Sequence, residues 1–352
     1  MNRRRNLVTV VCIILGFVWI SSTTAGEPIR NKAGEILKAQ ATDLDGNPTV
    51  ITLERIKPER PYKLAYLAPP LYNPYFTAMV YGVFDEAERM RLPRPILLAT
   101  KTYQALDQQA SQVEDVLARG VDAILISPLS YEGSAEMVAR AAEKVPIISV
   151  AQAVQTDAVS VTVETNNYES GKISAEYMTK ESKGKAKVAL LKGPPGASWS
   201  NERVQGLKDV FAKHPDMVIA AERWCSHERA ETMKITEDFL QKVPDLDWIW
   251  APVSTRGPIL ALQAAGKAGK VRVVSESPEL REDYRDMEEG RLHLMVSDQP
   301  TLIGRIAIQE AIRVLNGDRI VKHIYGPKGV YTPETLCNFD ESLAWAPEDF
   351  RP

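Results

Sequence analysis

The sequence predicts an α/β protein made of two doubly wound lobes, each a parallel sheet with helices on both faces. Two observations carry this prediction. Short runs rich in Val, Ile and Leu alternate with longer amphipathic stretches from about residue 62 to residue 330, which is the pattern of βα units on parallel sheets. The 352 residues, 44% of them hydrophobic, also suffice for two domains of ~100–200 residues each.

The strands follow from the short apolar runs. In the first lobe we expect strands at residues 62–68, 96–99, 123–126, 147–150 and 160–163. In the second lobe we expect them at residues 188–191, 217–221, 248–251, 271–275 and 292–296. The intervening stretches place apolar residues on one helical face, as in 76–89 and 107–119, and Gly120 supplies a helix stop before the next strand.

The first 25 residues have the composition of a secretory signal peptide. Arginines at positions 3–5 precede an uncharged run over 7–20, and Thr23 and Ala25 suit a peptidase that cleaves before the next glycine. The run is shorter than the ~20 residues of a membrane-spanning helix. We therefore expect a periplasmic protein cleaved near Ala25, with an uncleaved signal anchor as the alternative.

Charge and composition exclude several partners. Without the three arginines of the predicted signal peptide, 40 of the 43 basic residues remain against 46 acidic ones and form no dense basic block, so nucleic acid is not an expected partner. In an oxidising compartment Cys225 and Cys337 can pair or remain two separate thiols, and their spacing does not decide between these states.

The signatures of common enzymes are missing from the sequence. No P-loop, no Gly-x-Gly-x-x-Gly turn and no nucleophile elbow follows any expected strand. The histidines lie far apart, without the spacing of a metal site: His214, His227, His293 and His323. The sequence therefore predicts a binding protein without catalytic residues, metal or cofactor.

Ligands of open α/β sheets bind beyond the carboxyl ends of the strands, so the residues that follow each strand are the candidate contacts. In the first lobe, Tyr72, Tyr75 and Phe76 follow the first strand, Tyr103 follows the second and Gln152 follows the fourth. Three rings together are more than a turn requires, although Phe76 also lies on the apolar helix face and can belong to the core instead.

The second lobe adds four candidates after its strands: Trp199, Arg203, His227 and Asp298. Arg203 offers a bidentate fork for a carboxylate or phosphate, and Trp199 offers a face for a cation or flat ring. Two alternatives stay open. Arg203 can be a surface residue paired with Glu202 or Asp209, and Asp298 can cap the following helix.

From residue 62 to about residue 332 the chain resembles the type I periplasmic binding proteins, the group that contains the ribose-binding proteins. The resemblance rests on the order of seven motifs: YNPYF, ARGVDAILISP, VPIISV, NNYESG, NERVQG, SDQPTLIG and AIQEAIRVLNG. It implies two lobes that clamp a small ligand, joined by a hinge of three chain crossings. The N-terminal lobe would comprise 62–164 and 298–327, and the C-terminal lobe and tail would comprise 165–297 and 328–352.

The resemblance carries over to some ligand-binding positions. Tyr75 and Phe76 match the paired aromatics that sandwich the sugar ring, Arg203 matches the cleft arginine, and Asp298 stands where those proteins have a polar hinge residue. The second-lobe residues that hold sugar hydroxyls fall on positions 253 and 277, which are Val and Ser here. Sugar hydroxyls would be poorly satisfied in such a pocket, which disfavours a free sugar.

A closer resemblance is to the TorT-type periplasmic sensors, which present trimethylamine N-oxide to a membrane histidine kinase. It rests on the polar extension 26–61, the SDQ at the hinge and the tail ending SLAWAPEDFRP. Tyr75, Phe76 and Tyr103 match rings that box the methylated nitrogen, whereas Val163 replaces an aromatic residue at the hinge.

The TorT-type resemblance implies a small-molecule receptor that signals to the periplasmic domain of a histidine kinase. The alternative is the substrate-binding subunit of an ABC importer, with a permease as partner and a sugar-like or other small polar solute as ligand. The extension, with a β-like run at 49–53, and the tail can dock on such a receptor. Equally, they can cover exposed edges of the lobes.

Overall fold

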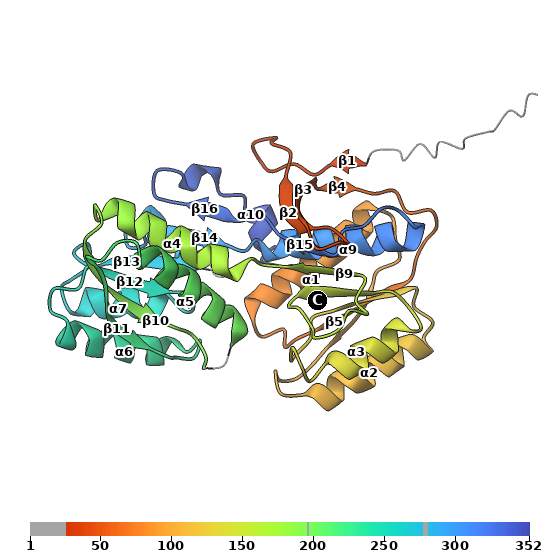
Figure 1. Ribbon diagram of the computed structural model, residues 1–352, viewed down its shortest axis with the longest axis horizontal. Helices are drawn as coiled ribbons and strands as arrows, with labels where there is room; N and C mark the ends of the chain where they lie inside the picture. Colours follow the sequence, from red (N-terminus) through yellow and green to blue (C-terminus); the bar gives the residue numbers. More distant parts are fainter. Residues whose placement is uncertain (1–25, 196, 277–280) are drawn as a thin grey trace, which may run out of the picture.

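The computed structural model describes residues 26–195, 197–276 and 281–352, so the predicted signal peptide and Ser277 lie outside the described residues. Figure 1 shows two lobes side by side, and the chain passes between them more than once. All ten strands expected from the sequence are present, with ends shifted by no more than two residues. The predicted α/β fold with two parallel-dominated lobes is confirmed. Among the described residues, none of the helices has both the length and the apolarity needed to cross a bilayer.

The N-terminal lobe (N-lobe) is built on an eight-stranded sheet of order β3-β2-β15-β9-β8-β7-β5-β6. Its strands are β2 (Lys38–Thr42), β3 (Pro48–Thr52), β5 (Leu64–Ala68), β6 (Ile96–Ala99), β7 (Ala123–Ile126), β8 (Ile147–Ala151), β9 (Val161–Glu164) and β15 (His323–Tyr325). Its helices are α1 (Pro74–Arg89), α2 (Leu106–Ala118), α3 (Ala135–Ala142) and α9 (Pro300–Asn316). In this order, the six strands β15, β9, β8, β7, β5 and β6 run parallel to one another. Strands β2 and β3 form an antiparallel edge.

The C-terminal lobe (C-lobe) has a six-stranded sheet of order β11-β10-β12-β13-β14-β16. Its strands are β10 (Ala186–Leu191), β11 (Met217–Arg223), β12 (Trp248–Ala251), β13 (Arg272–Glu276), β14 (Leu294–Ser297) and β16 (Gly329–Tyr331). Its helices are α4 (Asn167–Glu181), α5 (Ser198–Phe211), α6 (Arg229–Lys242), α7 (Arg256–Ala264) and α8 (Arg281–Glu288). The tail adds the short helices η1 (Leu336–Asn338) and α10 (Glu341–Ala344).

Each sheet has an apolar core on both faces, which explains why its central strands, such as β5 and β7, are apolar throughout. In β5, Leu64, Tyr66 and Ala68 belong to the core under α1 and α9. The alternate residues Ala65 and Leu67 belong to the core under α2 and α3. Successive side chains of a strand point to opposite faces, so a sheet covered on both sides needs such continuous runs.

One helix pair in each lobe crosses with its backbones in contact, α1 with α9 and α4 with α5. A Cβ atom on Gly82 would lie 2.0 Å from the carbonyl oxygen of Thr301. A Cβ atom on Gly171, in the NNYESG motif, would lie 1.9 Å from the carbonyl oxygen of Arg203. Only glycine allows such an approach. The contact between α4 and α5 therefore fixes the position of Arg203 relative to α4.

The N-terminal extension belongs to the N-lobe fold. Its strand β2 pairs with β15, and β3 becomes the sheet edge. The last part of the extension includes the short strand β4 (Glu54–Arg55), which pairs with β1 (Glu27–Pro28). An ion pair holds this part in place, because Arg55 Nε lies 2.7 Å from the fully buried carboxylate of Glu86. This arrangement supports the edge-covering interpretation of the extension. Cys225 is buried, Cys337 is exposed, and both are free thiols.

Candidate ligand-binding cleft

Three chain crossings connect the lobes. They are residues 164–167 between β9 and α4, residues 297–300 between β14 and α9, and residues 325–329 between β15 and β16. The parallel strands of each sheet end on the side of these crossings, so the loops that follow them border the junction of the lobes. Such junctions are where ligands bind in open α/β sheets.

Backbone strain concentrates at these strand ends. Ala151 at the end of β8, Ser254 after β12 and Gln299 after β14 have φ angles of 67°, 34° and 53°. Residues other than glycine rarely adopt this left-handed region. Strained backbone that persists only because its surroundings impose it clusters at binding and active sites, which marks the junction as a functional site.

Four aromatic rings form the N-lobe wall of the junction. Tyr72 and Tyr103 lie edge to face at 6.2 Å, Tyr75 and Phe76 at 5.2 Å, and Phe76 lies 6.3 Å from Tyr103. Asn73 caps α1 by accepting from the backbone of Tyr75, and its amide donates to the Tyr103 hydroxyl at 2.9 Å. Phe76 is 5% exposed and belongs to the N-lobe core, as the core interpretation expects, and its contact with a ligand stays a prediction.

The C-lobe wall centres on the start of α5. The Arg203 guanidinium lies 5.2 Å from the centre of the Trp199 ring, and that ring lies 6.2 Å from His227. Desolvation by the surrounding loops lowers the pKa of His227, against a smaller opposite effect of Glu228. His227 is therefore a neutral imidazole at neutral pH, with one donor and one acceptor for a ligand.

A buried group of charges lies between the two walls, and we call it the hinge cluster: Asn167, Arg203, Glu276, Asp298 and Lys328. Arg203 Nε donates to Asn167 at 3.0 Å, and Arg203 Nη2 donates to Asp298 at 2.7 Å. Lys328 Nζ donates to the other oxygen of Asp298 at 2.5 Å. Since Asn167, Asp298 and Lys328 each belong to a different crossing, this chain of contacts joins all three hinge segments.

Glu276 supplies the second negative charge of the hinge cluster. It is 1% exposed, and its Oε1 accepts from Ser174 and Trp250, each at 2.6 Å. Its Oε2 lies 3.5 Å from Arg203 Nε, and among the described residues no donor makes a hydrogen bond to it.

The pKa shifts of the hinge cluster follow from its burial. Desolvation raises the pKa of Glu276, with Arg203 as the main opposing charge. It also lowers the pKa of Lys328, which Asp298 opposes. For Arg203 desolvation favours the neutral form, but Asp298 and Glu276 outweigh it and raise the pKa, with a further contribution from Tyr75 of the opposite wall.

The predicted residues fall into two groups and one outlier. The four aromatics are together on the N-lobe wall, and Trp199, Arg203, His227 and Asp298 are together on the C-lobe wall and hinge. Gln152 follows β8, where its carbonyl accepts from Ser149 at 2.6 Å, but its side chain makes no hydrogen bond or ring contact to the others within the described chain.

Both alternatives for the charged candidates are wrong. Arg203 is 3% exposed, so it is not a surface residue paired with Glu202 or Asp209. Asp298 does not cap α9, because Gln299 is the residue at that position and it makes no side-chain cap. The buried pair of Arg203 and Asp298 explains both outcomes.

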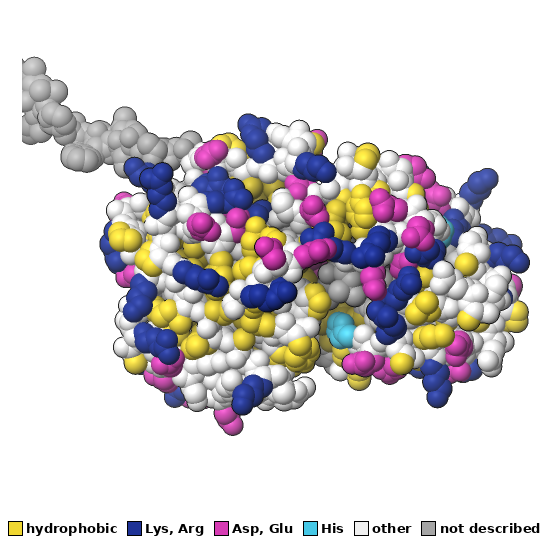
Figure 2. Space-filling model, turned by 180° about the vertical axis from the view of Figure 1, so that it is seen from behind, with side chains coloured by type: hydrophobic (Ala, Val, Ile, Leu, Met, Phe, Trp, Pro, Cys, Tyr) yellow, Lys and Arg dark blue, Asp and Glu magenta, His cyan; other side chains and the backbone are white. Residues whose placement is uncertain are grey.

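A small cavity of about 60 Å³ lies in the C-lobe wall, bordered by His227, Val253 and Glu276 among others. A larger hollow of about 720 Å³ lies outside the junction, between α1 and the tail. None of the predicted site residues lines that hollow. On the face in Figure 2, acidic and basic side chains are interspersed over both lobes, and no field of one sign attracts a polyanion there.

The chain is similar to known proteins over most of its length. The family model of the periplasmic binding protein domain matches residues 64–319. The ribose import binding protein RbsB of Bacillus subtilis is 27% identical over 258 residues, 73% of this chain and 83% of that protein. The periplasmic protein TorT of Escherichia coli K12 is 26% identical over 311 residues, 86% of this chain and 87% of that protein. The solved structure of an ABC transporter solute-binding protein from a Bradyrhizobium species, with bound Bis-Tris, gives a TM-score of 0.82 at 24% identity and covers 90% of this chain and 97% of that chain.

Proposed function

The chain belongs to the periplasmic binding protein domain family, and we propose that it is a periplasmic receptor, not an enzyme, that clamps one small polar molecule between its lobes. The observation that carries the proposal is the position of Arg203. This side chain borders the junction beside Trp199, and it is tied through the hinge cluster to all three chain crossings. A ligand that engages it acts directly on the hinge, as a clamp requires.

The charge balance of the hinge cluster favours a ligand without net negative charge. Arg203 and Lys328 are already matched by Asp298 and Glu276. An anionic group at Arg203 would meet two buried carboxylates, and like charges at such distances repel strongly in a low dielectric. The free Oε2 of Glu276 instead accepts a hydrogen bond from a ligand hydroxyl or N–H group, while the aromatic wall suits a flat or methylated part.

We propose that the partner is the periplasmic domain of a membrane histidine kinase. Similarity to TorT extends over more of this chain than similarity to RbsB, and this supports the sensor role. The second candidate is the substrate-binding subunit of an ABC importer, supported by the similarity to RbsB. Cross-linking in the native periplasm distinguishes them, because a kinase captured on the protein supports the first role and a permease the second.

The test of receptor function begins with the molecule that the protein carries. We would purify the exported protein from its own periplasm, denature it, and identify the released small molecule by mass spectrometry. Calorimetry of this molecule with the emptied protein should give one site per chain with micromolar or tighter affinity. Conversion of the molecule to a product would show an enzyme, and failure to bind it would refute the proposed receptor.

A further inference from the structure

The C-terminal tail runs across both lobes. It leaves the C-lobe sheet after β16, passes through η1 and α10, and ends over α1 of the N-lobe (Figure 1). In the sequence this segment is recognisable only by its prolines and by the ending SLAWAPEDFRP. The contacts described below give this segment two separate anchors, one on each side of the hinge.

The first anchor is an aromatic cluster on the C-lobe. Phe339 and Trp345 lie 4.6 Å apart, and Tyr284 of α8 lies 5.5 Å from Phe339 and 6.3 Å from Trp345. Tyr331 of β16 lies 5.0 Å from Phe339, and the Arg281 guanidinium lies 4.9 Å from the centre of the Trp345 ring. Phe339 and Trp345 are buried in the C-lobe core, so this end is held tightly.

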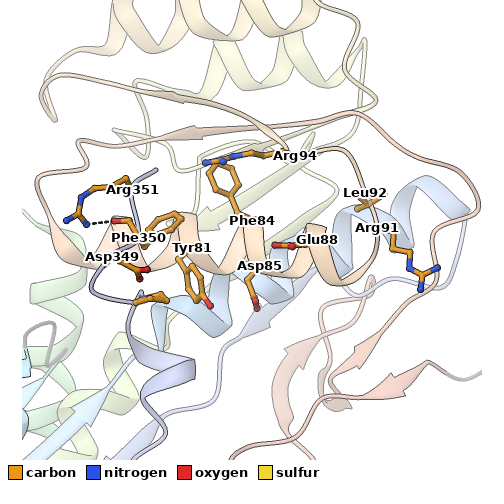
Figure 3. Close-up of a pocket in the computed structure, with 11 residues that line it drawn as sticks. Tyr81, Phe84, Asp85, Glu88, Arg91, Leu92, Arg94, Asp349, Phe350 and Arg351 are labelled. Carbon is orange, nitrogen blue, oxygen red and sulfur yellow. Dashed lines mark hydrogen bonds between the residues drawn. The ribbon is translucent and has the colours of Figure 1, made fainter.

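The second anchor is on the N-lobe, and its last contact lies at the end of the tail. The Phe350 ring lies 5.2 Å from Tyr81 and 6.3 Å from Phe84, both on the outer face of α1 (Figure 3). Leu343 belongs to the N-lobe core, and Asp340 accepts a hydrogen bond at 2.6 Å from the backbone of the N-terminal extension. The hollow of about 720 Å³ borders Phe350, and this half-buried ring is less enclosed than the buried Phe339, Leu343 and Trp345.

Consecutive residues of the tail therefore belong to different lobes. Leu343 packs into the N-lobe core, whereas Ala344 and Trp345 pack into the C-lobe core. A rotation of one lobe relative to the other must shear this segment or release one anchor. Packed interfaces resist gradual deformation and change by discrete steps, and the weaker anchor gives way first.

We propose that residues 339–350 form a strap that limits the range of angles between the two lobes, and that Phe350 is its releasable end. The strap acts through the hinge and does not depend on which ligand the cleft binds. Its failure and the failure of the proposed receptor function are therefore separate outcomes.

The test measures the lobe angle in the exported protein without added ligand. Spin labels would be placed on Glu136→Cys in α3 and Lys213→Cys after α5, in a Cys337→Ser background. Double electron–electron resonance then gives the distribution of distances between the lobes. The variants are Phe350→Ala and a deletion of residues 346–352, and the matched control is Asp349→Ala, which changes an exposed neighbour.

We expect the distance distribution to broaden in Phe350→Ala and in the deletion, but not in Asp349→Ala. Hydrogen exchange at residues 345–350 should accelerate about tenfold in Phe350→Ala, because a half-buried aromatic contact is worth about one tenfold step in an equilibrium constant. Melting curves of the deletion should retain one native transition, since the core residues up to Trp345 stay in place. Distributions of both variants that coincide with the control would overturn the strap, and broadening in the deletion alone would overturn the role of Phe350.

Discussion

Replacing Arg203 by Met removes one charge of the hinge cluster and keeps most of the side-chain volume. Asp298 retains Lys328 at 2.5 Å, so the loss falls mainly on Glu276. That carboxylate is 1% exposed and has Arg203 as its nearest cation. Breaking a buried ion pair by removing one partner costs about 3–5 kcal/mol. We expect the free energy of unfolding of the C-lobe to fall by that amount at pH 7.

The stability lost in Arg203→Met should become smaller as the pH falls. Burial already raises the pKa of Glu276, and Arg203 is the main charge that opposes the rise. Without Arg203 the native carboxyl holds its proton to still higher pH, whereas an unfolded Glu titrates near ~4.3. Between these two pKa values the native state binds more protons than the unfolded state, so stability increases as the pH falls. The variant should therefore regain stability relative to the wild type between pH 7 and pH 5.

Urea unfolding followed by tryptophan fluorescence measures this prediction at both pH values. The second variant is Arg203→Met with Glu276→Gln, because Gln keeps an acceptor for Ser174 and Trp250 but carries no charge. It should recover most of the lost stability, and Glu276→Gln alone should change stability little. A loss below ~1 kcal/mol in Arg203→Met, or no recovery in the double variant, would show that the buried pair does not control this region.

Three further outcomes follow from single contacts. Gly171→Ala should cost about 1–3 kcal/mol in urea unfolding and weaken calorimetric binding of the co-purified ligand, because its Cβ atom would lie 1.9 Å from the carbonyl oxygen of Arg203. Arg55→Ala should lower stability by about 1.5–3 kcal/mol, seen as a lower melting temperature, because the buried Glu86 loses its partner at 2.7 Å. Tyr103→Phe should cost about 0.5–1.5 kcal/mol in urea unfolding, since its hydroxyl accepts a hydrogen bond at 2.9 Å from an asparagine side chain.

The strands were predictable because their signal is local. In β5 and β7, alternate side chains fill cores on opposite faces, so each whole strand must be apolar. A run of four or five consecutive apolar residues shows this property directly in the sequence. Among the strands missed, β2, β15 and β16 are short and partly polar. They exist because a distant segment offers a free edge: β2 pairs with β15 across nearly 300 residues, and no pattern within the run itself records this pairing.

The candidate site was predictable only in part, for the same reason. The aromatic rings of YNPYF lie within five consecutive residues at the start of α1, so their grouping was visible in the sequence. Lys328 lies in a loop between two strands that the sequence did not predict, and Glu276 is one acidic residue at a strand end among many. Their role appears only when the three crossings meet and place them beside Arg203. No spacing rule connects these positions.

In the proposed receptor, we expect the hinge cluster to carry the effect of ligand binding to the rest of the molecule. A ligand can shift the angle between the lobes only to the extent that it binds one angle better than another. Arg203 meets this condition because it contacts the crossing at Asn167 and the crossing at Asp298 and borders the junction beside Trp199. A ligand group that draws the guanidinium away from Asp298 would weaken the contact between the crossings at Asn167 and Asp298. Lys328, which donates to Asp298, would then transmit this change to the third crossing. Sensing and closing are therefore, in the proposed receptor, two consequences of one side chain's hydrogen bonds.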